Sequence, residues 1–233
     1  MRCYQRSRTD LEPRANWRGG LPEVNLPENL TLLNYVTCNG NTYIQTDIYV
    51  TNELGGEAKA ARTLEFGSNT ETFSRYIFSS RSLAYGNGKD NFYHMPHLNS
   101  DGYSIRAGFG PGVEIPIKEP YTLGTPYVSS INLYNSGEAV WNGEVLHVFD
   151  HTQFPSDKWC KLPTALLGFT NDVGVYGGYR WIGDFYYALF TLGDKTHRYF
   201  VPVLETSSGQ AKIYEVIEGK VYEPVGSPFS SWG

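Results

Sequence analysis

Residues 138–149 read Glu-Ala-Val-Trp-Asn-Gly-Glu-Val-Leu-His-Val-Phe, and this stretch decides the fold class. Two short runs rich in β-branched and aromatic residues flank Asn142-Gly143. Asn and Gly both tolerate a positive φ, so a type I′ turn closes there with little strain. The stretch therefore predicts a β-hairpin with strands at 138–141 and 144–149.

The same pattern extends in both directions from this hairpin. Strand-forming runs recur at intervals of roughly 8–12 residues, which is typical of a sandwich or barrel. Turn sequences such as Gly86-Asn87-Gly88 separate them, and no long stretch has a convincing helical period. The further candidate strands are 30–36, 42–50, 62–66, 75–78, 82–85, 103–107, 127–134, 165–169, 181–191, 199–204, 211–214 and 220–223.

Two of these segments carry more specific expectations. The runs 30–36 and 42–50 flank Cys38-Asn39-Gly40-Asn41, and Asn-Gly is a hairpin signal, so we expect the two runs to pair with each other. In 181–191 both alternating sets of side chains are apolar, which indicates a central strand with both faces covered.

Composition supports one folded domain and excludes several classes of protein. The chain has 233 residues, of which 40% are hydrophobic, 15% aromatic and only 18% charged. The net charge of −5 disfavours nucleic acid as the main partner. Because the sequence has neither a signal-peptide pattern nor about 18 consecutive apolar residues, we expect no membrane association. Three cysteines without a C-x-x-C pair indicate neither a disulfide framework nor a zinc knuckle.

The first residues differ from the rest and form an expected arm at 1–24, followed by a β-sandwich domain at 25–233. Five arginines against Asp10 and Glu12 give residues 1–20 a net charge of +3, and the arginines are Arg2, Arg6, Arg8, Arg14 and Arg18. Arginine forms bidentate pairs with carboxylates, so the arm is expected to dock on an acidic partner surface. The alternative is an unstructured tail.

Both ends of the domain carry motifs of a known family. Residues 32–36, Leu-Leu-Asn-Tyr-Val, and 40–48, Gly-Asn-Thr-Tyr-Ile-Gln-Thr-Asp-Ile, are similar to the opening of a concanavalin A-like (laminin G-like) jelly-roll domain. Residues 198–203, Arg-Tyr-Phe-Val-Pro-Val, resemble its "R-D-F-V-P-V" strand, and 209–229 resemble its closing segment. The chain departs from the pattern at Asp47, at Ala211 and at Glu215, where Gly, Gly and Asp are usual.

The resemblance carries expectations about fold and function. Members of the family are two-sheet antiparallel sandwiches, usually non-catalytic, that occur in bacteriophage virion proteins and gut bacterial surface proteins. It implies a structural protein of the virion surface, of the fibre or decoration type, whose partners are other virion proteins and a host glycan. A bacterial carbohydrate-binding or adhesion protein, at the cell surface or secreted, is the alternative, and a polysaccharide hydrolase is the third. Both a monomer and a homo-oligomer agree with the sequence.

Catalytic and metal-binding patterns are weak. The pair of acidic residues at i, i+2 that a strand-borne glycosidase centre needs occurs only as Asp10/Glu12, in the arm. On a strand His94 and His97 would point to opposite faces. His147 and His151 share a face only if their strand continues past Asp150, the third candidate ligand. Structural roles are therefore favoured over a metal site. Some relatives bind Ca²⁺, but no D-x-D-x-D-G loop is present, and we expect no cofactor.

The stretch 170–181 is the candidate glycan site. Its glycines indicate a loop between two strands, and sugars stack on aromatic rings while their hydroxyls bind amides and carboxylates. The alternative is that Tyr179 and Trp181 simply begin the next core strand. The candidate glycan-binding residues are Asn171, Asp172, Tyr176, Tyr179, Arg180 and Trp181.

Overall fold

The computed structural model describes residues 21–61, 76–81, 91–99, 102–108, 113–116, 122, 124–132, 138–148, 161–171, 174–176 and 180–233. Within these ranges the chain forms strands and no helix, so the expected all-β class is confirmed. No helix long and apolar enough to cross a membrane occurs in this part of the chain.

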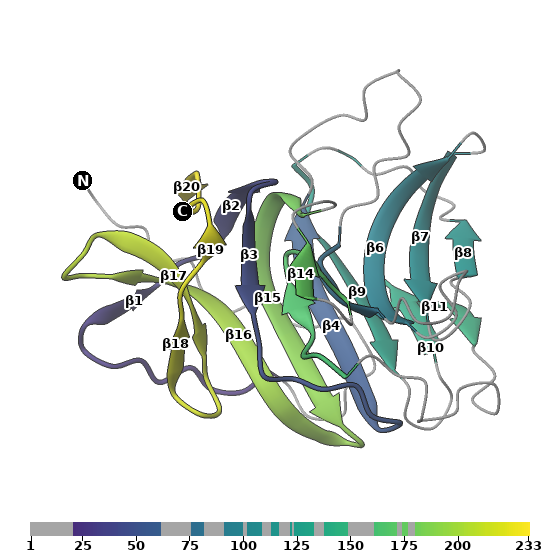
Figure 1. The fold of residues 1–233 in the computed structure, drawn as a ribbon, viewed down its shortest axis with the longest axis horizontal. Coiled ribbons are helices and arrows are strands. Elements are labelled where there is room, and N and C mark those ends of the chain that lie inside the picture. The colour runs from purple at the N-terminus through teal and green to yellow at the C-terminus, as the bar shows by residue number, and fades with distance from the viewer. Residues whose placement is uncertain are drawn as a thin grey trace.

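The strands belong to two sheets, which form the two layers in Figure 1. The eleven-stranded sheet contains β1 (Leu30–Leu32), β2 (Val36–Asn39), β4 (Leu54–Ala61), β9 (Tyr127–Asn132), β10 (Glu138–Trp141), β11 (Glu144–Val148), β15 (Ile182–Leu192), β16 (Lys195–Glu205), β17 (Gln210–Glu215), β18 (Lys220–Tyr222) and β20 (Ser231–Trp232). The nine-stranded sheet contains β3 (Thr42–Gln45), β5 (Phe78–Arg81), β6 (Asn91–Asn99), β7 (Gly102–Gly108), β8 (Val113–Pro116), β12 (Ala165–Leu166), β13 (Phe169–Asn171), β14 (Gly174–Tyr176) and β19 (Val225–Gly226).

The larger sheet has the order β11-β10-β9-β4-β15-β16-β17-β18, and β2 pairs with the first residues of β15 on the side opposite β4. The smaller sheet has the order β19-β3-β12-β5-β6-β7-β8. The described ladders are antiparallel except for the single parallel pair between β13 and β5. The chain is therefore a two-sheet antiparallel β-sandwich.

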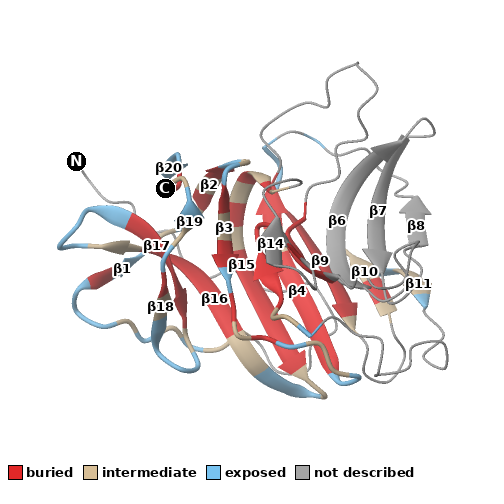
Figure 2. Cartoon of the chain, viewed as in Figure 1, coloured by how far each residue is buried: buried red, intermediate tan, exposed pale blue. Residues whose placement is uncertain are grey.

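The main core lies between the two sheets and appears as the red segments of Figure 2. Phe78 of β5 meets Phe190 of β15 edge to face, with ring centroids 5.5 Å apart, and Phe190 in turn meets Phe200 of β16 at 6.0 Å. Each buried aromatic side chain removes a large apolar area from water. The Phe78–Phe190 contact therefore packs the smaller sheet against the larger one.

The hairpin at 138–149 is confirmed for its described residues. Strands β10 and β11 pair with Trp141 opposite Glu144, and the turn residues Asn142 and Gly143 have φ of 47° and 86°. Both angles are positive, as a type I′ turn requires. Asn142 is also bonded to β9, because its Oδ1 accepts the Val128 N–H at 3.0 Å and its own N–H donates to the Val128 carbonyl at 2.8 Å.

The prediction that 30–36 and 42–50 pair as a hairpin is wrong. β2 pairs with β15 and β20 in the larger sheet, whereas β3 pairs with β12 and β19 in the smaller one. The turn at Gly40, whose φ is 87°, therefore crosses from one layer to the other. Burial explains why the chain crosses between the layers, because Val36 and Cys38 of β2 and Ile44 of β3 all contribute to the core between them.

The central position expected for 181–191 is confirmed. β15 pairs with β4, β16 and β2, and its side chains are buried on both faces of the sheet. A β-bulge shifts the register between Phe185 and Tyr187. The strict alternation of the sequence is thereby broken, so that Ala188 and Phe190 face the main core with Phe185, while Tyr187 and Leu189 belong to a second apolar cluster.

Several expected strands differ from the observed ones, or lie outside the described residues. The run 165–169 is divided into β12 and β13 by Leu167, which adopts a positive φ of 60°. β4 and β6 were not expected, and β3 ends at Gln45 rather than at residue 50. The expected strands 62–66 and 82–85 lie outside the described residues.

Candidate functional site

The predicted glycan-binding stretch contains a short hairpin. β13 and β14 pair antiparallel, with Phe169 opposite Tyr176 and Asn171 opposite Gly174. Asn171 also forms the parallel pair with Arg81 at the end of β5. Asp172, which follows β13 in the sequence, and Tyr179, which follows β14, are both outside the described residues. The hairpin is thus joined to the end of β5, an interior strand of the smaller sheet.

Arg180 ties this region to the turn between the two layers. Its Nη1 donates to the carbonyl of Asn41 at 2.8 Å, and its Cζ lies 4.9 Å from the centroid of the Tyr43 ring. A guanidinium over an aromatic face is a favourable cation–π arrangement. Gly226 allows the approach, since a Cβ there would lie 2.1 Å from the Asn41 carbonyl oxygen. Arg180 therefore has a structural role in joining the chain before β15 to Asn41 and to Tyr43 of β3.

Trp181 is fully buried in the main core. Its backbone N–H donates to the Leu167 carbonyl at 3.1 Å, and its indole Nε1 donates to the Asp184 carbonyl at 3.4 Å. A ring without exposed surface does not stack on a sugar from solvent. Trp181 thus matches the alternative interpretation, in which the residue begins the next core strand.

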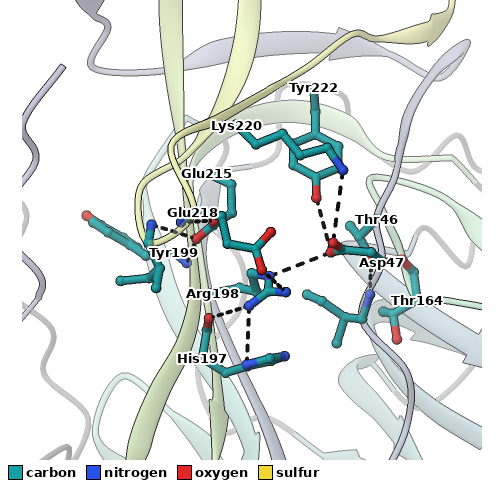
Figure 3. A network of polar contacts seen from close by, with 12 residues as sticks. Thr46, Asp47, Thr164, His197, Arg198, Tyr199, Glu215, Glu218, Lys220 and Tyr222 are labelled. Carbon is teal, nitrogen blue, oxygen red and sulfur yellow. Dashed lines mark hydrogen bonds and ion pairs between the residues drawn. The ribbon is translucent and has the colours of Figure 1, made fainter. Parts of the chain in front are cut away.

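A second set of polar residues, which the sequence analysis did not single out as a site, lies where the two sheets meet (Figure 3). Asp47 follows β3 of the smaller sheet, whereas Arg198 belongs to β16 of the larger one. Arg198 Nε lies 3.6 Å from Asp47 Oδ1, and Arg198 Nη2 forms an ion pair with Glu218 in the turn between β17 and β18. Arg198 Nη1 donates to the carbonyl of His197 at 2.9 Å. We call these residues, with Glu215, Lys220 and Tyr222, the inter-sheet network.

Asp47 accepts further contacts from the β18 side of the network. The Tyr222 hydroxyl donates to Asp47 Oδ1 at 3.1 Å, and Lys220 Nζ lies 4.0 Å from Asp47 Oδ2. Burial acts to raise the pKa of Asp47, but the Tyr222 hydrogen bond and the Arg198 charge outweigh it and lower the pKa below its ordinary value. The same carboxylate, together with burial, raises the pKa of Tyr222. Asp47 is therefore held ionised.

Glu215 fixes the turn that carries Glu218. It is fully buried, and its Oε1 accepts the backbone N–H groups of Tyr199 and Ile217, both at 2.9 Å. Its Oε2 accepts the N–H of Glu218 at 2.7 Å. A carboxylate that accepts three backbone N–H groups from neighbouring positions orders the loop around it. Glu215 therefore positions Glu218 beside Arg198.

The network joins the sheets and also presents charged groups at the surface. Only 12% of the Arg198 side chain is exposed, whereas Asp47, Glu218 and Lys220 are 39%, 42% and 51% exposed. Burial and the Arg198 charge lower the pKa of His197. The central guanidinium repels a cation, and no group of three or more His, Cys, Asp or Glu side chains suited to a metal ion occurs in the part of the chain that the structure describes. The arrangement suits ion pairing and hydrogen bonding rather than metal chemistry.

A signal for this network was present in the sequence. Asp47 and Glu215 are two of the three positions at which the chain departs from the family pattern, and Arg198 opens the strand motif at 198–203. The structure brings all three together. The five arginines of the arm lie outside the described residues.

Comparisons of this chain with known proteins found no match. No protein-family model matches the chain, and no curated protein or solved structure is similar to it.

Proposed function

We propose that this protein is a concanavalin A-like jelly roll that serves as a non-enzymatic structural component of a bacteriophage virion surface, of the fibre or decoration type. The single observation that carries the proposal is that the two segments bearing the family motifs lie together in the fold. Leu32 pairs with Val203 where β1 meets β16, and Thr42 and Tyr43 pair with Gly226 and Val225 where β3 meets β19. The motif residues at the two ends of the domain thus meet in both sheets.

The use of charged residues supports a structural role. Arg198 joins the two sheets, and Lys212 Nζ lies 2.9 Å from a Glu205 carboxylate oxygen and 2.6 Å from one of Glu223. These contacts hold strands β16, β17 and the end of β18 together. Paired charges of this kind can stabilise a fold, as a structural role requires.

The proposed glycan contact is at the β13–β14 hairpin. Asn171, Asp172, Tyr176 and Tyr179 supply an amide, a carboxylate and two aromatic rings within a short stretch, which is the chemistry that binds sugars. Arg180 anchors the end of this stretch to the Asn41 carbonyl. A short hairpin whose flanking residues are tied to the sheet is a suitable binding element.

The proposed partner of the arm is a neighbouring virion protein with an acidic surface. The arm carries +3 while the remaining residues sum to −8, because the whole chain is −5. Charge of opposite sign on a partner would attract the arm and not the sandwich.

Surface labelling tests the proposal. Antibodies raised against the purified chain should bind intact phage particles of the corresponding lysate, and the purified chain should release no reducing ends from a panel of polysaccharides. Antibodies that bind only the bacterial cell surface would favour the adhesion protein instead. Release of reducing ends would contradict the non-enzymatic assignment.

A further inference from the structure

The larger sheet carries a patch of aromatic and polar side chains on its outer face, the side opposite the main core, where β2 pairs with β15. The β-bulge of β15 helps to form it, because Tyr186 is the extra residue between Phe185 and Tyr187. A bulge redirects a side chain, and both Tyr186 and Tyr187 belong to the second apolar cluster while Phe185 faces the main core. We call the following partly exposed residues the outer patch: Tyr35, Thr37, Lys59, Asp184 and Tyr186.

Tyr35 and Tyr186 form the aromatic part of the outer patch. Their ring centroids are 5.8 Å apart and their planes are inclined at 44°, and Lys59 Nζ lies 5.3 Å from the centroid of the Tyr186 ring. Because the two rings contact each other, no cation fits between them as it would in an aromatic cage. The pair instead provides a joint ring surface on which an apolar ligand face can stack.

The backbone holds Tyr35 in place before any ligand binds. Its N–H donates to the carbonyl of Gly233 at 3.2 Å, and its carbonyl accepts the Gly233 N–H at 3.3 Å. The Tyr35 ring lies directly against Gly233, where an added Cβ would be 2.7 Å from ring atom Cε1. A ring that is already fixed loses little conformational entropy when a ligand stacks on it.

Asp184 supplies a carboxylate beside the rings. Thr37 lies opposite Asp184 in the β2–β15 ladder, and its hydroxyl donates to Asp184 Oδ1 at 2.6 Å. Among the described residues, no Lys or Arg forms an ion pair with Asp184, and none donates a hydrogen bond to Oδ2. Burial raises the pKa of Asp184, although the Thr37 hydrogen bond acts to lower it. A half-buried charge without a counter-ion costs stability, which favours a binding role over a structural one.

We propose that the outer patch binds a neutral sugar, whose ring stacks on the Tyr35–Tyr186 surface and whose hydroxyls donate to Asp184 Oδ2. Sugars combine an apolar ring face with hydroxyl donors, which is what these side chains complement. The opposite charges of Lys59 and Asp184 balance within the patch, so a charged ligand gains little there. The inference goes beyond the proposed function, because it concerns a site other than the β13–β14 hairpin and does not depend on a virion.

A change at Asp184 tests the proposal. The full chain is applied to an array of neutral oligosaccharides, and calorimetry with the best ligand compares the variants. Asp184→Asn keeps an acceptor for Thr37 but replaces the charged acceptor for the sugar, so affinity should fall about tenfold. Urea unfolding at neutral pH should show this variant to be at least as stable as the wild type, because burial disfavours the charge. Asp194→Asn makes the same change at an exposed position and should alter neither quantity. Unchanged affinity in Asp184→Asn would overturn the proposal.

Tyrosine variants separate the outer patch from the hairpin. Tyr35→Ala should weaken binding of the same oligosaccharide about fivefold, whereas Tyr49→Ala, which removes an exposed tyrosine elsewhere, should not. Affinity that falls in Tyr176→Ala but not in Tyr35→Ala or Asp184→Asn would assign the sugar to the hairpin and overturn the proposal. A wild type that binds an oligolysine peptide and no neutral oligosaccharide would overturn it as well. All these measurements use free protein, so failure of the virion assignment leaves them unaffected.

Discussion

Asp47 and Arg198, which lie far apart in the sequence, form an ion pair that joins the two sheets of the sandwich, with Arg198 Nε 3.6 Å from Asp47 Oδ1. The pair connects the segment 40–48 near the start of the sandwich with the first residue of the segment 198–203. Glu218, Lys220 and Tyr222 surround it, so the hairpin from β17 to β18 is tied to the chain that follows β3 (Figure 3). This contact makes the two ends of the domain depend on each other.

Removing the Asp47 charge should destabilise the fold. Asp47→Asn leaves the largely buried Arg198 paired with Glu218 and weakens the Lys220 contact. We expect a loss of about 1 kcal/mol in the free energy of unfolding, measured by urea denaturation. Asp194→Asn is the matched control, because Asp194 is exposed in the turn between β15 and β16, and it should be neutral. Equal stability of the two variants would contradict a stabilising role for the pair.

The contribution of Asp47 should depend on pH. Its pKa is lower in the folded chain than in the unfolded chain, where it is about 3.9, so the ionised carboxylate favours folding. The stabilisation is complete above the unfolded pKa and is lost as the pH falls through the folded pKa. The difference in unfolding free energy between the wild type and Asp47→Asn should therefore be constant near neutral pH and shrink below about pH 4. If the difference in unfolding free energy grows on acidification, the pKa of Asp47 is not lowered by folding.

The turn at 142–143 should tolerate little change. Gly143 has a φ of 86°, and a β-branched side chain is strained in that region. Gly143→Val should lower the unfolding free energy by about 1–2 kcal/mol, as judged by thermal and urea unfolding. Glu144→Val places the same side chain at the next position, which is exposed and has no positive φ, and it should cost far less. If the two variants lose the same unfolding free energy, backbone strain is not the reason that glycine occupies position 143.

Local turn chemistry made part of this fold predictable. The Asn142-Gly143 hairpin and the central strand at 181–191 follow from side-chain patterns within a few residues, and both are observed. The pairing of β2 and β3 with different sheets is set by long-range burial, which an Asn-Gly signal alone does not reveal. β4 has the sequence Leu-Gly-Gly-Glu-Ala-Lys-Ala-Ala, whose residues have low strand propensity, and tertiary pairing with β15 and β9 overrides that preference.

The candidate sites were less accessible to sequence reasoning. Trp181 is a residue type that often stacks on sugars, but it is buried in the core. Only its burial in the fold distinguishes a sugar-binding role from a core role. The inter-sheet network joins Asp47, Arg198 and Glu218 from three separate segments, so no spacing rule groups them. The unusual residues Asp47 and Glu215 marked the right places without indicating that Asp47 binds Arg198 and that Glu215 orders the turn carrying Glu218.

Glycan binding should depend on the β13–β14 hairpin. Tyr176→Ala removes one aromatic ring from the proposed site, and loss of a stacking ring costs about 1 kcal/mol, or about fivefold in affinity. Tyr49→Ala removes another tyrosine, which is exposed and distant in sequence, and it should bind as the wild type does. Binding is measured on a glycan array and then by calorimetry with the best ligand. An array without hits for the wild type would contradict glycan recognition, and equal binding by Tyr176→Ala would exclude this hairpin as the site.

The most direct test of the virion assignment is the amount of this chain in purified phage particles. Particles are separated by density gradient, and quantitative mass spectrometry compares the chain with the major capsid protein across the gradient. We expect a constant ratio in every particle fraction, persisting after washing at moderate salt. A chain that is absent from the particle fractions, or whose ratio to the capsid protein varies as that of a contaminant does, would contradict the account.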